Sequence, residues 1–79
     1  MGMYEKLSVS TDCHQVVSNN GSISIKPVDS SREAHERFQP IAEEAIEHEG
    51  EGYTIYPEPH PSGRYPGYDM LVLLRSTED

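Results

Sequence analysis

The dipeptide Asn20-Gly21 constrains the fold of this chain more than any other feature. It lies within residues 16–25, between two short runs that are rich in β-branched residues. Asn-Gly in such a setting is the strongest short-range signal for a β-hairpin, and a type I′ turn is expected because both residues tolerate positive φ. Ile23 and Ile25 alternate with polar residues, so the second strand of this hairpin is expected to have one buried face and one solvated face.

A helix is expected after the hairpin. Residues 29–31, Asp-Ser-Ser, offer an N-cap, and from there to Glu49 the apolar residues recur at helical spacing. Pro40 falls on the wet side, where it either bends the helix or begins a second short helix. Gly50 and Gly52 are expected to end the helix. The stripe predicted to face the core consists of Ala34, Phe38, Ile41, Ala42, Ala45 and Ile46.

Three further segments are expected to be extended. Residues 4–11 place alternate apolar side chains on one side, and residues 53–56 resemble a third strand. The apolar run 70–74 predicts a central strand covered on both faces, although a buried helix of that length fits as well. Pro27 either ends the second hairpin strand or marks it as an edge. The expected fold is a single α+β domain, residues 1–79, with a small antiparallel sheet of about four strands and one helix packed on a face (ββαββ).

The chain is acidic and short of core-forming residues. Leu, Ile, Val and Phe supply 15 of its 79 residues, and 6 basic against 14 acidic residues give a formal net charge of −8. Such a composition lies near the boundary with disorder, so we expect a homo-oligomer or a partner interface to supplement the core. The charge argues against direct binding to nucleic acid and to anionic membranes. A basic protein surface is the natural complement, whereas generic solubility or adaptation to salt explains the same charge without a function.

The sequence predicts no metal site, no cofactor and no enzyme activity. Familiar zinc-ligand spacings are absent among Cys13 and the four histidines, which we interpret as scattered surface or edge residues. Polar pairs such as Glu58 with His60, or His60 with Asp69, arise often by chance and lack a supporting catalytic motif. A lone cysteine, without a membrane-spanning run or a signal-peptide pattern, predicts a soluble cytoplasmic protein.

Two adjoining features favour a protein-binding surface. The C-terminal half of the expected helix is rich in glutamate and has no basic residue after Arg37, although carboxylates there oppose the helix dipole at a cost of about 0.3–1 kcal/mol each. Residues 50–68 then hold four of the five tyrosines and four of the six prolines. Tyrosine gives large contact area at low entropic cost, and proline pre-orders the backbone. The alternative is that the glutamate-rich helix face is simply solvated and that the small dipole penalties are tolerated without a function. The candidate partner-binding residues are Glu43, Glu44, Glu47, Glu51, Tyr53, Tyr56, Arg64, Tyr65 and Tyr68.

The tyrosines are not expected to act alike. Tyr53 and Tyr56 are three apart on a strand, so one should pack in the core and the other should be displayed. Tyr65 and Tyr68, close to Arg64, are the stronger candidates for contact, because Tyr and Arg dominate interface hot spots.

Residues 43–57, Glu-Glu-Ala-Ile-Glu-His-Glu-Gly-Glu-Gly-Tyr-Thr-Ile-Tyr-Pro, resemble a segment of the immunity proteins that neutralise colicin and pyocin nucleases. That family carries a Glu-rich helix ending in Glu-His, then a Gly turn, then Ile-Tyr-Tyr-Pro. The resemblance implies that the helix glutamates and Tyr56 contact a basic nuclease. It is confined to this segment: Ile55 stands where the family has its other key tyrosine, and the family's four-helix bundle differs from the hairpin fold expected here.

The expected function is therefore a small acidic inhibitor, of the kind carried by phages or plasmids, that binds and blocks the basic surface of a nuclease or another nucleic-acid-binding protein. In this role it would act as a nucleic-acid mimic or an immunity protein. The alternative is a non-enzymatic homodimeric structural or interaction module of generic acidity, joined for instance through a sheet edge.

Overall fold

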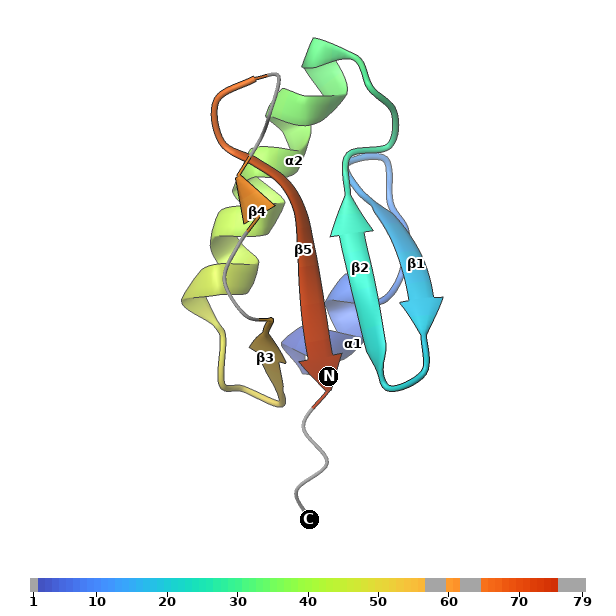
Figure 1. Ribbon diagram of the computed structural model, residues 1–79, viewed down its shortest axis with the longest axis vertical. Coiled ribbons are helices and arrows are strands. Elements are labelled where there is room, and N and C mark those ends of the chain that lie inside the picture. The colour runs from blue at the N-terminus through green and yellow to red at the C-terminus, as the bar shows by residue number, and fades with distance from the viewer. Residues whose placement is uncertain (1, 57–59, 62–64, 76–79) are drawn as a thin grey trace.

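The computed structural model describes residues 2–56, 60–61 and 65–75 (Figure 1). Two helices lie behind an antiparallel sheet whose strand order is β1-β2-β5-β3, and the two-residue strand β4 also pairs with β5. This arrangement confirms a small α+β domain with a helix packed on one face of the sheet. The elements are α1 (Met3–Leu7), β1 (Gln15–Asn19), β2 (Ser22–Lys26), α2 (Arg32–Glu47), β3 (Tyr53–Ile55), β4 (His60–Pro61) and β5 (Tyr68–Arg75).

The hairpin is confirmed, but its turn type is not the predicted one. β1 and β2 pair in antiparallel register, with Asn19 opposite Ser22. Among the described residues only glycines have positive φ, and Gly21 is one of them at 77°. A type I′ turn needs positive φ at Asn20 as well, so that prediction is wrong. β2 ends directly before Pro27 and lies between β1 and β5, so this proline ends the strand and does not mark an edge.

Helix α2 forms as the sequence predicts. It begins after Ser31, whose Oγ accepts a hydrogen bond from the N–H of Ala34 at 3.1 Å, while Asp29 Oδ1 accepts from the Ser31 N–H at 2.8 Å. The helix runs continuously past the exposed Pro40, so no second helix begins there. Its predicted stripe is buried at Ala34, Phe38, Ala42 and Ala45, and Ile41 and Ile46 pack against the same core.

Residues 4–11 do not form the predicted strand. Residues 3–7 are helical, Leu7 is buried in the core, and Val9 is 62% exposed. Met3 and Tyr4 also pack against the core, and their spacing from Leu7 is that of one helix face. This helical spacing prevails over the two-residue alternation, because the segment packs beneath the sheet and does not pair with it.

Strand β5 is the central strand, as predicted, but only one of its faces is covered. Leu71 and Leu73 are buried on the helix side, whereas Leu74 is 37% exposed and Val72 is half-buried on the opposite side. Within the described part of the chain both helices pack on the Leu71–Leu73 side, so the prediction of two covered faces is wrong. The segment 58–68, which lies between the expected strands 53–56 and 70–74, contains β4 and the first residue of β5.

No helix within residues 2–56, 60–61 and 65–75 combines the length and the apolar character that crossing a bilayer requires. The candidate contact residue Arg64 lies outside the described residues, as do residues 76–79.

Candidate protein-binding surface

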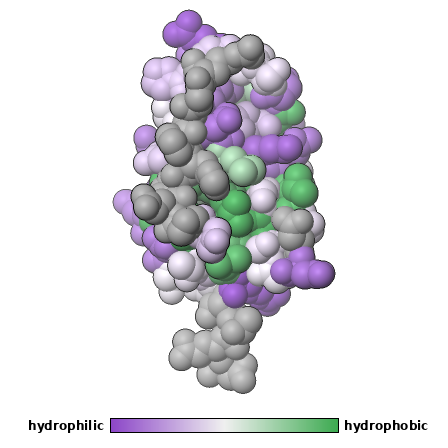
Figure 2. Space-filling model, in the orientation of Figure 1, coloured by the Kyte–Doolittle hydropathy of each residue, from purple (hydrophilic) through white to green (hydrophobic). Residues whose placement is uncertain are grey.

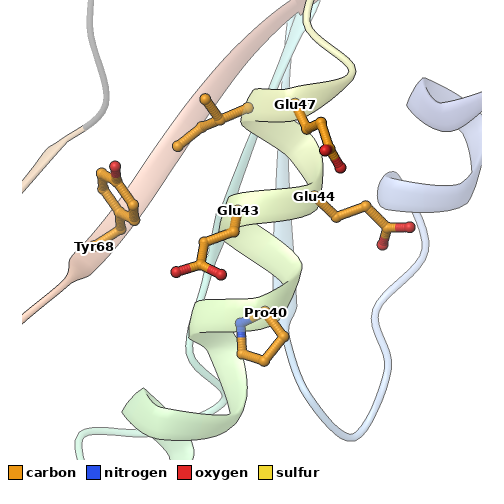
Figure 3. Close-up of a pocket in the computed structure, with 6 residues that line it drawn as sticks. Pro40, Glu43, Glu44, Glu47 and Tyr68 are labelled. Carbon is orange, nitrogen blue, oxygen red and sulfur yellow. The ribbon is translucent and has the colours of Figure 1, made fainter.

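Helix α2 and the start of β5 flank an open groove of about 630 Å³ (Figure 3). Four of the residues predicted to bind a partner line it together, three glutamates from the helix and one tyrosine from the strand. Figure 3 shows Glu43 on the side of the helix nearest Tyr68, while Glu44 points toward α1. We call this surface the acidic groove; its lining residues are Pro40, Glu43, Glu44, Ile46, Glu47 and Tyr68.

Several carboxylates at the end of α2 have partners within the chain. Glu44 Oε2 lies 3.8 Å from Lys6 Nζ, and Glu51 Oε2 lies 3.1 Å from His48 Nδ1. Glu49 accepts a hydrogen bond from a backbone N–H of β3 at 3.0 Å. The two side-chain pairs are solvent-exposed and contribute little to stability. These interactions nevertheless give a structural role to part of the negative charge that the sequence alone did not explain.

Glu43 and Glu47 are different. Both side chains are exposed, and among the described residues neither has an ion-pair or hydrogen-bond partner. They lie in the last two turns of α2, where a carboxylate opposes the helix dipole by about 0.3–1 kcal/mol. The unexplained acidity of the helix is thus concentrated at two carboxylates on one wall of the acidic groove.

Tyr53 and Tyr56 divide as the strand alternation predicts. Tyr53 is 1% exposed, and its hydroxyl donates a hydrogen bond to the carbonyl of Ala45. Burial, together with the negative charges of nearby glutamates, raises the pKa of Tyr53 to about 12. Tyr56 is 55% exposed and follows Thr54 on the face of the sheet that points away from α2. Tyr53 therefore packs in the core, and Tyr56 is displayed on a surface other than the acidic groove.

The segment from Tyr65 to Tyr68 is fastened to α2 by two side chains that sequence reasoning did not single out. His35 Nε2–H donates to the carbonyl of Pro66 at 2.8 Å, and the His35 ring lies 5.2 Å from the ring of Tyr65. The Gln39 amide donates to the Tyr68 carbonyl at 2.8 Å and accepts from the Tyr68 N–H at 2.7 Å. His35 and Gln39 are four residues apart, which places them one turn apart on one flank of the helix, and that spacing is the one signal available in the sequence.

Gly67 permits this close approach. Its φ is 108°, and a Cβ at this position would lie 2.2 Å from Gln39 Oε1. A side chain here would both strain the backbone and displace the amide of Gln39. The contacts from α2 therefore fix the backbone that presents Tyr68 to the acidic groove.

Two of the four histidines that the sequence suggested to be surface or edge residues are not exposed. His14 and His35 are both buried. His14 Nε2–H donates to the carbonyl of Leu7 at 3.1 Å, so its other nitrogen is free to accept from the Thr11 hydroxyl at 3.0 Å. These bonds join α1 to the start of β1. Within the residues that the structure describes, no three His, Cys, Asp or Glu side chains gather closely enough to hold a metal ion.

No protein-family model, curated protein or solved structure matches the chain. Any function for the acidic groove is therefore argued from its own geometry and charge.

Proposed function

We propose that this protein is a small inhibitor whose acidic groove binds the basic surface of a nuclease or another nucleic-acid-binding protein. The observation that carries the proposal is the pair Glu43 and Glu47, two exposed carboxylates without a cation partner in the described chain, which line the same groove as Tyr68. Their position at the end of a helix costs stability, and contact with a partner's Lys or Arg side chains would repay it.

Each part of the groove has a distinct physical role in such a complex. The net charge of −8 steers a basic partner toward the chain and accelerates association. Tyr68 supplies contact area, and its backbone is held by two hydrogen bonds to Gln39 before any partner arrives. Little ordering entropy is then lost on binding, so the tyrosine slows dissociation.

The resemblance of residues 43–57 to nuclease immunity proteins supports the same class of partner. A protein of this kind would be carried by a phage or a plasmid and would imitate the charge of nucleic acid. A cytoplasmic location belongs to the same proposal, since the lone Cys13 suits a reducing compartment.

The test is a tagged pull-down from host lysate, followed by kinetic measurements on the captured protein at low and at high salt. The groove variant is Glu43→Gln with Glu47→Gln. Its matched control is Glu33→Gln with Glu36→Gln, which removes the same charge from the same helix at positions already paired with Arg37 and Arg32.

We expect wild type and control to retain a basic partner that high salt releases, and the groove variant to associate about tenfold more slowly. Tyr68→Ala should mainly accelerate dissociation. The proposal fails if the groove variant binds the captured protein as fast as the control does, or if that protein has no basic surface.

A further inference from the structure

The face of the sheet opposite the helices forms a second, quite different surface. Antiparallel register places the alternate residues of all four longer strands on it, and Tyr56 continues the pattern beyond β3. We call it the open sheet face. Its residues are Gln15, Val17, Ser22, Ser24, Lys26, Thr54, Tyr56, Met70, Val72 and Leu74.

The open sheet face carries an apolar row along β5. Leu74 is 37% exposed, and Met70 and Val72 are half-buried on the same side of the strand. Val17, which is 43% exposed, lies on the edge strand β1 and is separated from this row by Ser22 and Ser24 of β2. Figure 2 shows hydrophobic residues gathered over the middle of this face and hydrophilic residues around its margin. Contiguous exposed apolar surface of this kind is typical of an interaction site, whereas isolated exposed apolar residues are not.

The distribution of charged residues indicates which molecule can bind the open sheet face. Among its described residues the open sheet face carries one charged side chain, Lys26, and no carboxylate, although the chain as a whole has 14 acidic residues. Asp29 and Asp69 border the face beside Lys26 and Met70. Two copies of a chain with a net charge of −8 repel each other most strongly where the helix carboxylates are presented. On the described part of this face a second copy meets apolar groups and Lys26, and the carboxylates of Asp29 and Asp69 lie at its margin.

The edges of the sheet are less suited to the same purpose. On β1 the outward N–H of Val16 already donates to Ser10 Oγ at 3.1 Å. On β3 the outward N–H of Ile55 donates to Glu49 at 3.0 Å, and the carbonyl of Tyr53 accepts from Gly50 at 2.8 Å. Each edge strand therefore has at least one outward backbone group already bonded, which makes it a poorer template for another strand. Pairing between sheet edges, which the sequence suggested as one route to a dimer, is thus obstructed on both sides.

We propose that a second copy of this chain docks on the open sheet face, so that two sheets pack face to face in a two-fold dimer. Aligned sheets stack about 10 Å apart and bury alternate side chains between them. Such a dimer would cover the second face of β5, which the sequence led us to expect as buried. It leaves the acidic groove on the outside of both copies, and it does not depend on the function proposed for that groove.

Salt separates this association from partner binding. Raising ionic strength screens the repulsion between two acidic chains and should strengthen the dimer. The same change should weaken binding of a basic partner to the acidic groove. The two surfaces are therefore expected to respond to salt with opposite sign.

The test is sedimentation equilibrium of the whole chain over a range of concentrations, at about 0.05 M and about 0.5 M salt. We expect a monomer–dimer equilibrium that tightens with salt. Leu74→Glu should raise the dimer dissociation constant at least about tenfold, because it places a carboxylate in the apolar row of β5. Val17→Glu, on the edge strand β1, is a second variant for use if Leu74→Glu does not fold.

Val9→Glu is the matched control. It makes the same chemical change at a more exposed valine, in the connection between α1 and β1 and outside the sheet. It should leave the dissociation constant within about twofold of the wild-type value. The proposal is overturned if the wild-type chain stays monomeric up to about 1 mM, if salt dissociates the dimer, or if the control weakens it as much as the face variants do.

Discussion

Removal of one oxygen atom, in Tyr53→Phe, tests how the end of α2 is held. The Tyr53 hydroxyl donates to the carbonyl of Ala45, which lies in the last turn of the helix. The usual donor to that carbonyl would be the N–H of Glu49, four residues later, but this N–H bonds to the carbonyl of Ile46 at 3.2 Å. The tyrosine hydroxyl therefore takes the place of a missing helical donor and acts as a C-terminal cap from the next strand.

The magnitude follows from what the substitution leaves behind. Phenylalanine fills nearly the same volume, so the core loses no packing, but the buried Ala45 carbonyl loses its partner. An unsatisfied buried carbonyl costs about 1–3 kcal/mol. We expect Tyr53→Phe to lower the free energy of unfolding by about 1–2 kcal/mol at pH 7, and to lower Tm by roughly 5–15 °C in a domain of this size.

Urea denaturation followed by far-ultraviolet circular dichroism measures this change. Tyr56→Phe is the control, because it removes the same atom from a side chain that is 55% exposed, and it should shift the free energy by less than about 0.5 kcal/mol. Equal midpoints for the two variants would refute the capping role of the Tyr53 hydroxyl.

The pH dependence gives an independent check. The pKa of Tyr53 is raised to about 12 in the folded chain, mainly by burial, whereas an unfolded tyrosine ionises near pH 10. The folded state therefore keeps a proton that the unfolded state loses. The stabilisation is complete below pH 10 and is lost as the pH rises toward 12. Tyr53→Phe has no phenol to ionise at this position, so its deficit relative to wild type should shrink over that range. A deficit that stays constant would contradict the burial of the hydroxyl.

Two further substitutions test other contacts. Gln39→Glu keeps the shape of the side chain but cannot donate to the carbonyls of His35 and Tyr68, both 2.8 Å away. It should lower the free energy of unfolding, measured by urea denaturation, by about 1–3 kcal/mol and accelerate hydrogen exchange at the Tyr68 N–H. Unchanged exchange would mean that Gln39 does not hold this segment. Ser31→Ala removes the cap that accepts from the Ala34 N–H and should cost about 1 kcal/mol, while its neighbour variant Ser30→Ala should be nearly neutral; equal losses would exclude the assigned cap.

The parts of the fold that the sequence predicted are those with local signals. The hairpin follows from Asn20-Gly21 between β-branched runs, and α2 follows from its cap and a stripe of helical period. Short helix α1 lacked such a signal, because a five-residue helix has little intrinsic stability and depends on the packing of Leu7. Two competing periodicities met in that segment, and tertiary contact decided between them.

The candidate site was predictable only in part. Glutamates and tyrosines stand out in the composition, so Glu43, Glu47 and Tyr68 could be proposed as neighbours before the fold was known. The bonds from His35 and Gln39 join residues 29 and 31 positions apart in the sequence. Contacts between residues so far apart in the sequence produce no periodic residue pattern. A single sequence also does not distinguish a buried histidine from an exposed one.

The wrong prediction that both faces of β5 are covered has the same cause as the small size of the core. Residues 70–74 are apolar enough for both faces of a central strand, but covering both faces requires a second layer, and Leu, Ile, Val and Phe supply only 15 residues to the whole chain. Residues 3–7 and 32–47 suffice to cover one face. Val72 and Leu74 are then left on the far side, where a monomer derives little benefit from their apolar surface. The apolar run 70–74 is consistent with the structure if another molecule supplies the missing layer. The open sheet face carries almost no charge in a very acidic chain. A second copy therefore suits this face better than the basic partner that is proposed for the acidic groove.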